Sequence, residues 1–189
     1  MTHVVLLAAT CRFAPMFLQY AGRVDCLTIV ACDCEHPMLL MVSQALSQHG
    51  VDVAIVEQPG TGIGAALQNA RHRVLEMGGN VFVVEDDIML PRQWSKALGI
   101  YRRRTITSKT WTDEDEFTHA GMMGFTPEQY DAVTQIRLEH RGAEADRRII
   151  DQVKPAQVDE QCLHLTDESI GSFFASDYED GISKFWEMK

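Results

Sequence analysis

Short apolar runs and amphipathic segments alternate along the first half of the chain. Four apolar runs, at residues 4–10, 26–31, 51–56 and 81–84, predict buried β-strands. The segments between them carry apolar residues three and four positions apart, the spacing of a helix with one buried face. Continuous apolar strands separated by such helices predict an α/β fold with a mostly parallel central sheet flanked by helices on both sides.

The second half of the chain is less regular. Residues 101–116 are polar and charged and predict a loop, whereas 117–125 and 161–165 predict strands. The sequence Thr126-Pro127-Glu128-Gln129 is typical of a capping box at the start of a helix. In chain order, we expect helices around 13–20, at 37–48, from about 65 to 77, from 91 onward, from 127 to about 139, and at 142–153.

Length and composition are those of an ordinary globular protein. The 189 residues fit a single domain, and 46% of them are hydrophobic. The formal net charge of −10 argues against passive binding to nucleic acid or to an anionic membrane, which both prefer a basic surface. The number of cysteines is five, and an odd number predicts reduced thiols. The N-terminus lacks the charged region of a signal peptide, so we expect a soluble, cytoplasmic protein.

Polar residues follow each of the four predicted strands. Thr10, Asp33, Glu57 and the triplet Glu85-Asp86-Asp87 all lie where a strand ends. Because ligands of parallel α/β sheets bind at the carboxyl ends of the strands, these residues predict one shared site.

The triplet Glu85-Asp86-Asp87 carries the most specific chemistry. Three adjacent carboxylates at the end of a buried strand repel one another and lose hydration unless a cation offsets both effects. Carboxylate oxygens suit Mg²⁺ or Mn²⁺, and these ions commonly also hold phosphate oxygens. The alternative, that Asp87 only caps the following helix, accounts for one of the three carboxylates.

Three other motifs allow more than one interpretation. The turn Gly60–Gly64 lacks the spacing of a dinucleotide fingerprint and the ending of a phosphate loop, although its helix start could direct amides toward an anion. The segment Cys32–His36 has no second Cys/His pair, which argues against a zinc site. The basic cluster Arg102–Arg104 is either a solvated helix end or a clamp for phosphates.

The segment Val84–Asp87, followed by Leu90-Pro91, resembles the metal-binding motif of nucleotide-sugar-dependent glycosyltransferases with the GT-A fold. Many of these enzymes carry Asp-x-Asp at the end of the fourth strand, and the N-acetylglucosaminyltransferase I family carries Glu-Asp-Asp there. Upstream, Gly64–Ala70 resembles the glycine-alanine-asparagine helix of the family, Val5–Arg12 its first strand and nucleotide loop, and Ile29–Asp33 its second strand. The resemblance covers about residues 3–100.

The resemblance implies a single GT-A-like (Rossmann-like) domain at 1–189, with a nucleotide-sugar-binding half at 1–100 and an acceptor-binding and catalytic half at 101–189. It implies that Asp87 binds a divalent Mn or Mg ion. It also implies nucleotide-binding roles for Thr10, Arg12, Asp33, Glu85 and Asp86. The segment 143–148 is similar to the one that supplies the catalytic base in inverting members, which makes Glu144 and Asp146 candidate bases, and His164 matches a late metal-ligating histidine by position.

The resemblance therefore implies an enzyme that moves a sugar from a nucleotide-diphosphate sugar to an acceptor hydroxyl. The acceptor is expected to be a saccharide or a hydroxymethylated base in DNA, as in virus-encoded DNA modification, and no membrane partner is expected. A nucleotidyltransferase has a similar layout, but such enzymes open with a glycine-rich loop, and Ala8–Arg12 contains no glycine. The non-enzyme alternative is a nucleotide-sugar-binding module without catalysis.

Overall fold

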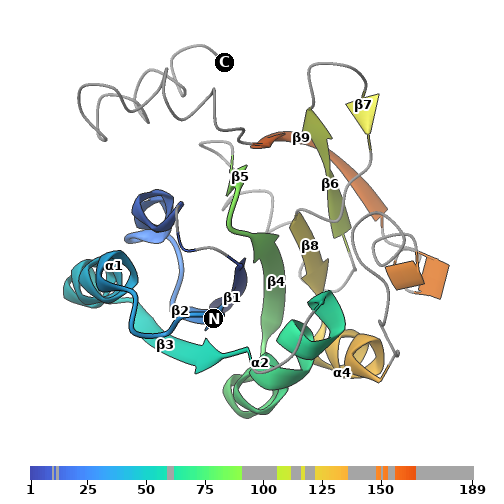
Figure 1. The fold of residues 1–189 in the computed structure, drawn as a ribbon. Coiled ribbons are helices and arrows are strands. Elements are labelled where there is room, and N and C mark those ends of the chain that lie inside the picture. Colours follow the sequence, from blue (N-terminus) through green and yellow to red (C-terminus); the bar gives the residue numbers. More distant parts are fainter. Residues whose placement is uncertain are drawn as a thin grey trace.

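The chain forms a mixed α/β fold in which one sheet separates two layers of helices (Figure 1). The computed structural model describes residues 1–9, 11, 13–58, 62–90, 106–111, 116–117, 122–135, 148–149, 151–152 and 156–164. In this part of the chain, no helix is both long enough and apolar enough to cross a membrane.

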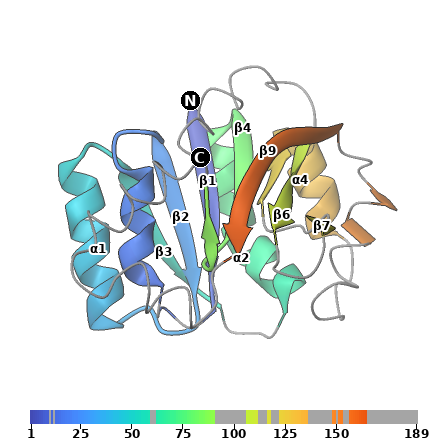
Figure 2. The same cartoon turned by 90° about the horizontal axis from the view of Figure 1, so that it is seen from above.

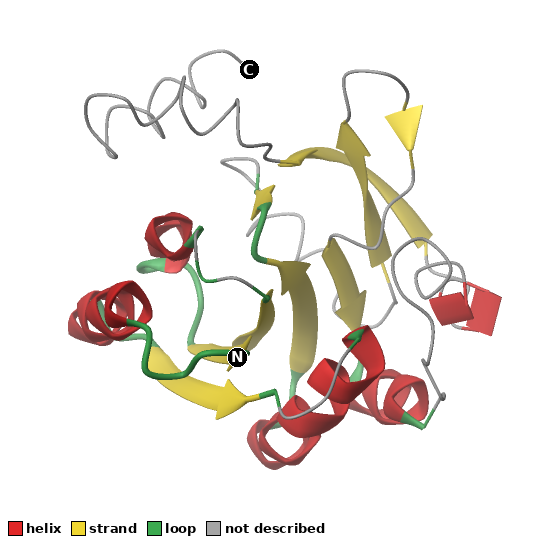
Figure 3. Cartoon of the chain, in the orientation of Figure 1, coloured by secondary structure: helices red, strands yellow, loops and turns green. Residues whose placement is uncertain are grey.

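The described helices and strands largely follow the predicted pattern (Figure 3). The helices are η1 (Ala14–Tyr20, a 3-10 helix), α1 (Pro37–Gln48), α2 (Ile63–Met77) and α4 (Pro127–Thr134). The strands are β1 (Thr2–Ala8), β2 (Cys26–Ala31), β3 (Asp52–Glu57), β4 (Asn80–Glu85), β5 (Ile88–Met89), β6 (Ile106–Trp111), β7 (Glu116–Phe117), β8 (Met122–Phe125) and β9 (Ala156–His164).

The loop predicted at 101–116 is wrong for residues 106–111, which form β6. This strand reads Ile-Thr-Ser-Lys-Thr-Trp, so its polar residues concealed it, although threonine and the aromatic residue favour strands. β6 pairs with β8 on one side and with β9 on the other, and these long-range partners decide its structure. The helix expected from Pro91 lies outside the described residues.

The four central strands are parallel and lie in the order β3-β2-β1-β4. β8 then pairs with β4 in the antiparallel direction, and β6, β9 and β5 follow. Figure 2 shows β2, β1 and β4 side by side, with β6 and β9 beyond β4. The predicted fold class, with a mostly parallel central sheet flanked by helices, is therefore confirmed for the central strands.

Alternate side chains of the central strands enter two different cores. Val4 and Leu6 of β1 pack with η1 and α1, whereas Val5 and Leu7 pack with α2 and α4. Because both faces of these strands are buried, they read as continuous apolar runs rather than as an alternating pattern. The capping box at Thr126 is formed, and it sets the start of α4.

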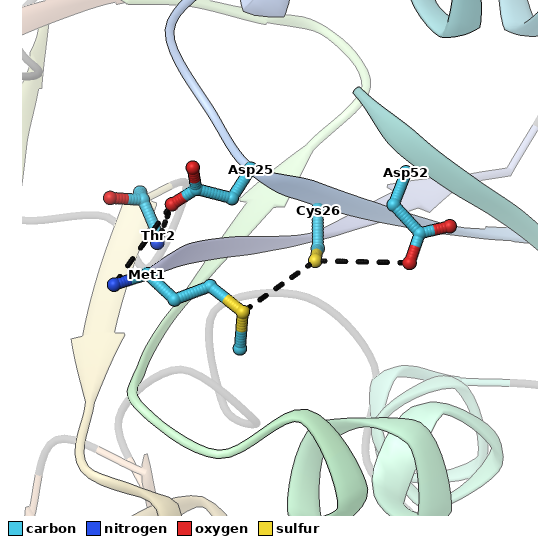
Figure 4. Close-up of polar contacts among 5 residues, drawn as sticks. All are labelled: Met1, Thr2, Asp25, Cys26 and Asp52. Carbon is cyan, nitrogen blue, oxygen red and sulfur yellow. Dashed lines mark hydrogen bonds and ion pairs between the residues drawn. The ribbon is translucent and has the colours of Figure 1, made fainter. Parts of the chain in front are cut away.

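Polar contacts join the amino ends of the parallel strands, at the edge opposite their carboxyl ends (Figure 4). The carboxylate of Asp25 accepts a hydrogen bond of 2.6 Å from the backbone N–H of Thr2 and lies 4.0 Å from the Met1 amino group. The thiol of Cys26 lies 4.0 Å from both the Met1 sulfur and an Asp52 carboxylate oxygen. These contacts link the amino ends of β1, β2 and β3 to one another.

Candidate functional site

The carboxyl ends of the four parallel strands are aligned. In register, Ala8 of β1 pairs with Ala31 of β2, and Ala31 pairs with Glu57 of β3. On the other side of β1, Leu7 pairs with Glu85 of β4. The residues that follow these strands therefore emerge at one edge of the sheet, where ligands of parallel α/β sheets bind.

The acidic triplet spans the last residue of β4, Glu85, and the turn to β5, Asp86-Asp87. Asp86 is buried, with 8% of its surface exposed, and Glu85 and Asp87 are half-buried. The backbone N–H of Asp86 donates a hydrogen bond of 3.0 Å to the carbonyl oxygen of Leu7. Because β5 begins directly after Asp87, at Ile88, Asp87 is not the N-cap of a helix, and the capping interpretation is wrong.

A cavity of about 310 Å³ opens beside this turn. Its polar wall is the acidic triplet, and its other walls come from the ends of β1 and β3 and the first turn of α2. The lining residues are Leu7, Ala9, Gln58, Gly62, Ile63, Ala66, Glu85, Asp86 and Asp87.

The start of α2 faces the same cavity as the carboxylates. Gly62 precedes the helix with φ of 96°, a conformation that favours glycine, and its carbonyl oxygen accepts a hydrogen bond of 3.2 Å from the Gln58 side chain. No side chain caps the helix, and its first turn contains no acidic residue. The backbone N–H groups at this end carry partial positive charge, so the cavity combines a carboxylate wall with a wall suited to an anion.

Cys11 lies between the acidic turn and the end of β2. It is 1% exposed, and its thiol lies 3.8 Å from the backbone carbonyl oxygen of Asp33. Burial raises the pKa of the Cys11 thiol, and the nearby carboxylates of Asp86 and Asp33 raise it further. Asp33 and Asp86, which lie far apart in the sequence, are therefore neighbours across one buried thiol.

The backbone of Cys11 has φ of 54°, the only positive φ of a non-glycine residue in the described part of the chain. Such conformations cost free energy in an L-residue and cluster at functional sites. Sequence reasoning did not single out this position, because nothing about a cysteine signals a left-handed backbone.

Asp33 itself is exposed and does not line the cavity. Its carboxylate accepts a hydrogen bond of 3.1 Å from the backbone N–H of Glu35, which shapes the turn after β2. Burial raises the pKa of the neighbouring Cys34 thiol, and Glu57 contributes further to that rise. Glu57 and Asp33 thus belong to the same strand-end surface, outside the cavity.

The other predicted site residues are not all described by the structure. Thr10, Arg12, Glu144 and Asp146 lie outside the described residues. His164 is the last residue of β9, and its backbone is in register with Ile88, directly after the acidic turn. The pairing of β5 with β9 therefore brings position 164 next to the triplet, although it lies 77 positions after Asp87 in the sequence.

The donor set of the cavity suits a hard divalent cation. Among the described residues, no three His, Cys, Asp or Glu side chains converge as a closed metal cage. Mg²⁺ commonly binds proteins through one or two carboxylates and completes its shell with waters and substrate phosphates. An open site at Asp86 and Asp87 fits that mode of binding, whereas a fully protein-bound metal does not.

No protein-family model matches the chain, and no curated protein matches its sequence significantly. Several solved structures nevertheless have a similar fold. The inositol-1-phosphate CTP transferase from T. maritima superposes with a TM-score of 0.62 at 10% identity, covering 96% of this chain and 95% of that chain. The 4-diphosphocytidyl-2C-methyl-D-erythritol synthase from Anaerococcus prevotii DSM 20548 superposes with 0.59 at 10% identity, over 89% and 94%.

A candidate nucleotide-diphospho-sugar transferase from Desulfovibrio desulfuricans G20 superposes with a TM-score of 0.57 at 13% identity, over 99% of this chain and 95% of that chain. At these identities the similarity shows the fold alone. The chain therefore has a nucleotide-diphospho-sugar transferase-like fold, which agrees with the predicted GT-A-like architecture.

Proposed function

We propose that the chain is a metal-dependent glycosyltransferase that moves a sugar from a nucleotide-diphosphate sugar to an acceptor hydroxyl. The observation that carries the proposal is the cavity in which the Glu85-Asp86-Asp87 turn faces the start of α2. A diphosphate alone would be repelled by the carboxylates. A diphosphate that carries Mn²⁺ or Mg²⁺ offers positive charge to the triplet and phosphate oxygens to the helix amides.

Each candidate residue has a role in this proposal. Asp87, with His164, would bind the metal, and Glu85 and Asp86 would hold the ribose and the metal-bound waters. Thr10, Arg12 and Asp33 would contact the nucleotide. The metal, when bound, stabilises the charge that develops on the departing diphosphate.

The sugar is transferred with either inversion or retention, and only the inverting reaction needs a carboxylate here to take the proton of the acceptor hydroxyl. Glu144 or Asp146 would serve as the general base, because a carboxylate near the hydroxyl can take that proton. The acceptor is either a small saccharide or a hydroxymethylated base in DNA. The net charge of −10 favours the saccharide, because a DNA substrate is attracted by a basic surface.

A nucleotidyltransferase is the second candidate, and the comparisons are consistent with it. Two proteins of similar fold are named as a CTP transferase and a diphosphocytidyl-methylerythritol synthase. The loop after β1 has no glycine, which argued against this class. However, Cys11 adopts φ of 54°, a backbone conformation typical of glycine, so the loop takes a glycine-like shape at that position.

Product analysis distinguishes the two reactions. The protein is incubated with Mn²⁺ and either nucleotide-diphosphate sugars plus saccharide acceptors or nucleoside triphosphates plus sugar phosphates. Release of nucleoside diphosphate from the first mixture supports glycosyl transfer, and release of pyrophosphate from the second supports nucleotidyl transfer. A protein that binds these donors but releases neither product would be a non-catalytic binding module. A parallel reaction with hydroxymethylated duplex DNA tests the DNA acceptor, which is wrong if no nucleoside gains mass while a saccharide does.

A further inference from the structure

The side chain of Gln19 reaches from η1 to the strand that follows the acidic turn. Its carboxamide nitrogen donates a hydrogen bond of 3.2 Å to the carbonyl oxygen of Ile88, and its oxygen accepts one of 2.9 Å from the backbone N–H of Leu90. Gln19 is 5% exposed, and both of its partners are fully buried. Both ends of this buried carboxamide are hydrogen-bonded to backbone. The side chain is held in this position, because a buried polar group without a hydrogen-bond partner would cost free energy.

These two hydrogen bonds have the pattern that a neighbouring β-strand would form with β5. In a strand, the backbone groups of successive residues point to opposite edges, and those of every second residue to the same edge. Met89 pairs with Leu163 of β9, so the carbonyl of Ile88 and the N–H of Leu90 point to the other edge of β5. At that edge, the Gln19 carboxamide donates to the carbonyl of Ile88 and accepts from the N–H of Leu90. One residue of a parallel strand would form the same two bonds with its backbone.

This contact holds β5, the strand that joins the two segments that would form the metal site. β5 consists of two residues and begins directly after Asp87. On its other edge, Ile88 is in register with His164. With only two residues, β5 has little ladder of its own to hold it, so the two bonds from Gln19 help to hold β5 in place against η1 while its other edge pairs with β9.

We propose that Gln19 is a positioning residue for the metal site, which it aligns by holding β5 between η1 and β9. This inference rests on the proposed function. Gln19 does not touch the cavity, so its effect is transmitted through the backbone of Ile88 and Leu90 to Asp87 and position 164. Loss of the carboxamide therefore weakens metal affinity more than it weakens the fold.

The test compares Mn²⁺ affinity, measured by electron paramagnetic resonance in the presence of a nucleoside diphosphate, in wild type, Gln19→Leu and Thr28→Val. Thr28→Val is the matched control, because it removes another buried side-chain hydrogen bond, the 2.7 Å contact with His3 near the opposite edge. We expect Gln19→Leu to lose at least tenfold in Mn²⁺ affinity, and Thr28→Val to stay within twofold of wild type.

The conservative variant Gln19→Glu adds a second measurement, the pH dependence of Mn²⁺ affinity, which a purely structural role of Gln19 would not change. In Gln19→Glu, the ionised side chain can accept from Leu90 but cannot donate to Ile88, whereas its protonated form can do both. Relative to wild type at the same pH, its Mn²⁺ affinity should recover as the pH falls from 7 to 5.

Three results would overturn the inference. If wild type binds Mn²⁺ and Gln19→Leu, still folded by circular dichroism, binds it as tightly, the positioning role is wrong and the proposed function stands. If Gln19→Leu and Thr28→Val lose affinity equally, the loss reflects general destabilisation. A wild type that binds no Mn²⁺ with any nucleoside diphosphate would contradict the proposed function as well.

Discussion

The backbone N–H of Asp86 donates a hydrogen bond of 3.0 Å to the carbonyl oxygen of Leu7. The hydrogen bonding of β4 with β1 therefore continues one residue into the acidic motif, to the backbone of the buried Asp86. Because Leu7 also lines the cavity, the same contact sets the distance between the cavity floor and the carboxylates.

Ligand binding should protect an exposed thiol near Asp33. Cys32 is exposed and precedes Asp33, whereas Cys11 is buried and its pKa is raised. Since the thiolate is the reactive form, iodoacetamide should alkylate Cys32 before Cys11. Saturating Mn²⁺ and nucleoside diphosphate should slow alkylation of Cys32, as followed by peptide mass spectrometry. The same rate with and without ligand would argue against a nucleotide at Asp33, and Asp33→Asn serves as a control in which protection should be lost.

His3 should make the fold sensitive to acid. The side chain is 1% exposed, and burial, with a further contribution from Arg73, lowers its pKa from 6.5 to about 4 despite the opposing charge of Asp52. The unfolded chain then binds more protons than the folded one below pH 6.5, so stability is fully present above that pH and falls as the pH drops toward 4. From pH 7 to pH 5 we expect His3 to account for a loss of about 2 kcal/mol.

Urea unfolding at the two pH values measures this loss, and in His3→Gln the difference between them should shrink by that amount. His72, whose side chain is 96% exposed, provides the matched control, and His72→Gln should keep the pH dependence of wild type. Equal pH dependence in wild type and His3→Gln would mean that folding does not lower the pKa of His3.

The contact between α4 and α2 should contribute measurably to the free energy of unfolding. The hydroxyl of Tyr130 donates a buried hydrogen bond of 2.7 Å to the carbonyl oxygen of Leu67, and the ring packs edge-on against Phe125 with centroids 6.1 Å apart. Tyr130→Phe removes only the hydrogen bond, so we expect a loss of about 1 kcal/mol and a melting temperature lower by about 2 to 4 °C. An unchanged melting temperature would show that this hydrogen bond contributes nothing net to stability.

The sequence predicted correctly those elements whose structure follows from a local pattern of residues. The four parallel strands are buried on both faces, so their apolar runs were visible, and the alignment of their carboxyl ends follows from the parallel order. The start of α4 was readable because the capping box lies within four residues, from Thr126 to Gln129.

The features that sequence reasoning missed depend on distant partners. Gln19 contacts residues 69 and 71 positions away, and nothing in its own surroundings indicates β5. The strand β6 is decided by pairing with β8 and β9 rather than by its own polar sequence. For the first turn of α2, the sequence left open that its amides face an anion, but it did not show that Ile63 and Ala66 line the same cavity as the acidic triplet.

Metal-dependent binding of nucleotides tests the central claim most directly. The melting temperature of wild type, Asp87→Asn and Glu57→Gln is measured with UDP, GDP, ADP and CDP, each with and without Mn²⁺. Glu57→Gln is the matched control, because Glu57 ends a strand at the same edge but does not line the cavity. With a nucleotide at 100 times its Kd, we predict a gain of about 2.7 kcal/mol, or roughly 5 to 10 °C, that requires Mn²⁺. Wild type and Glu57→Gln should show this gain and Asp87→Asn should lose it, whereas an equal Mn²⁺-dependent gain in Asp87→Asn would contradict the account.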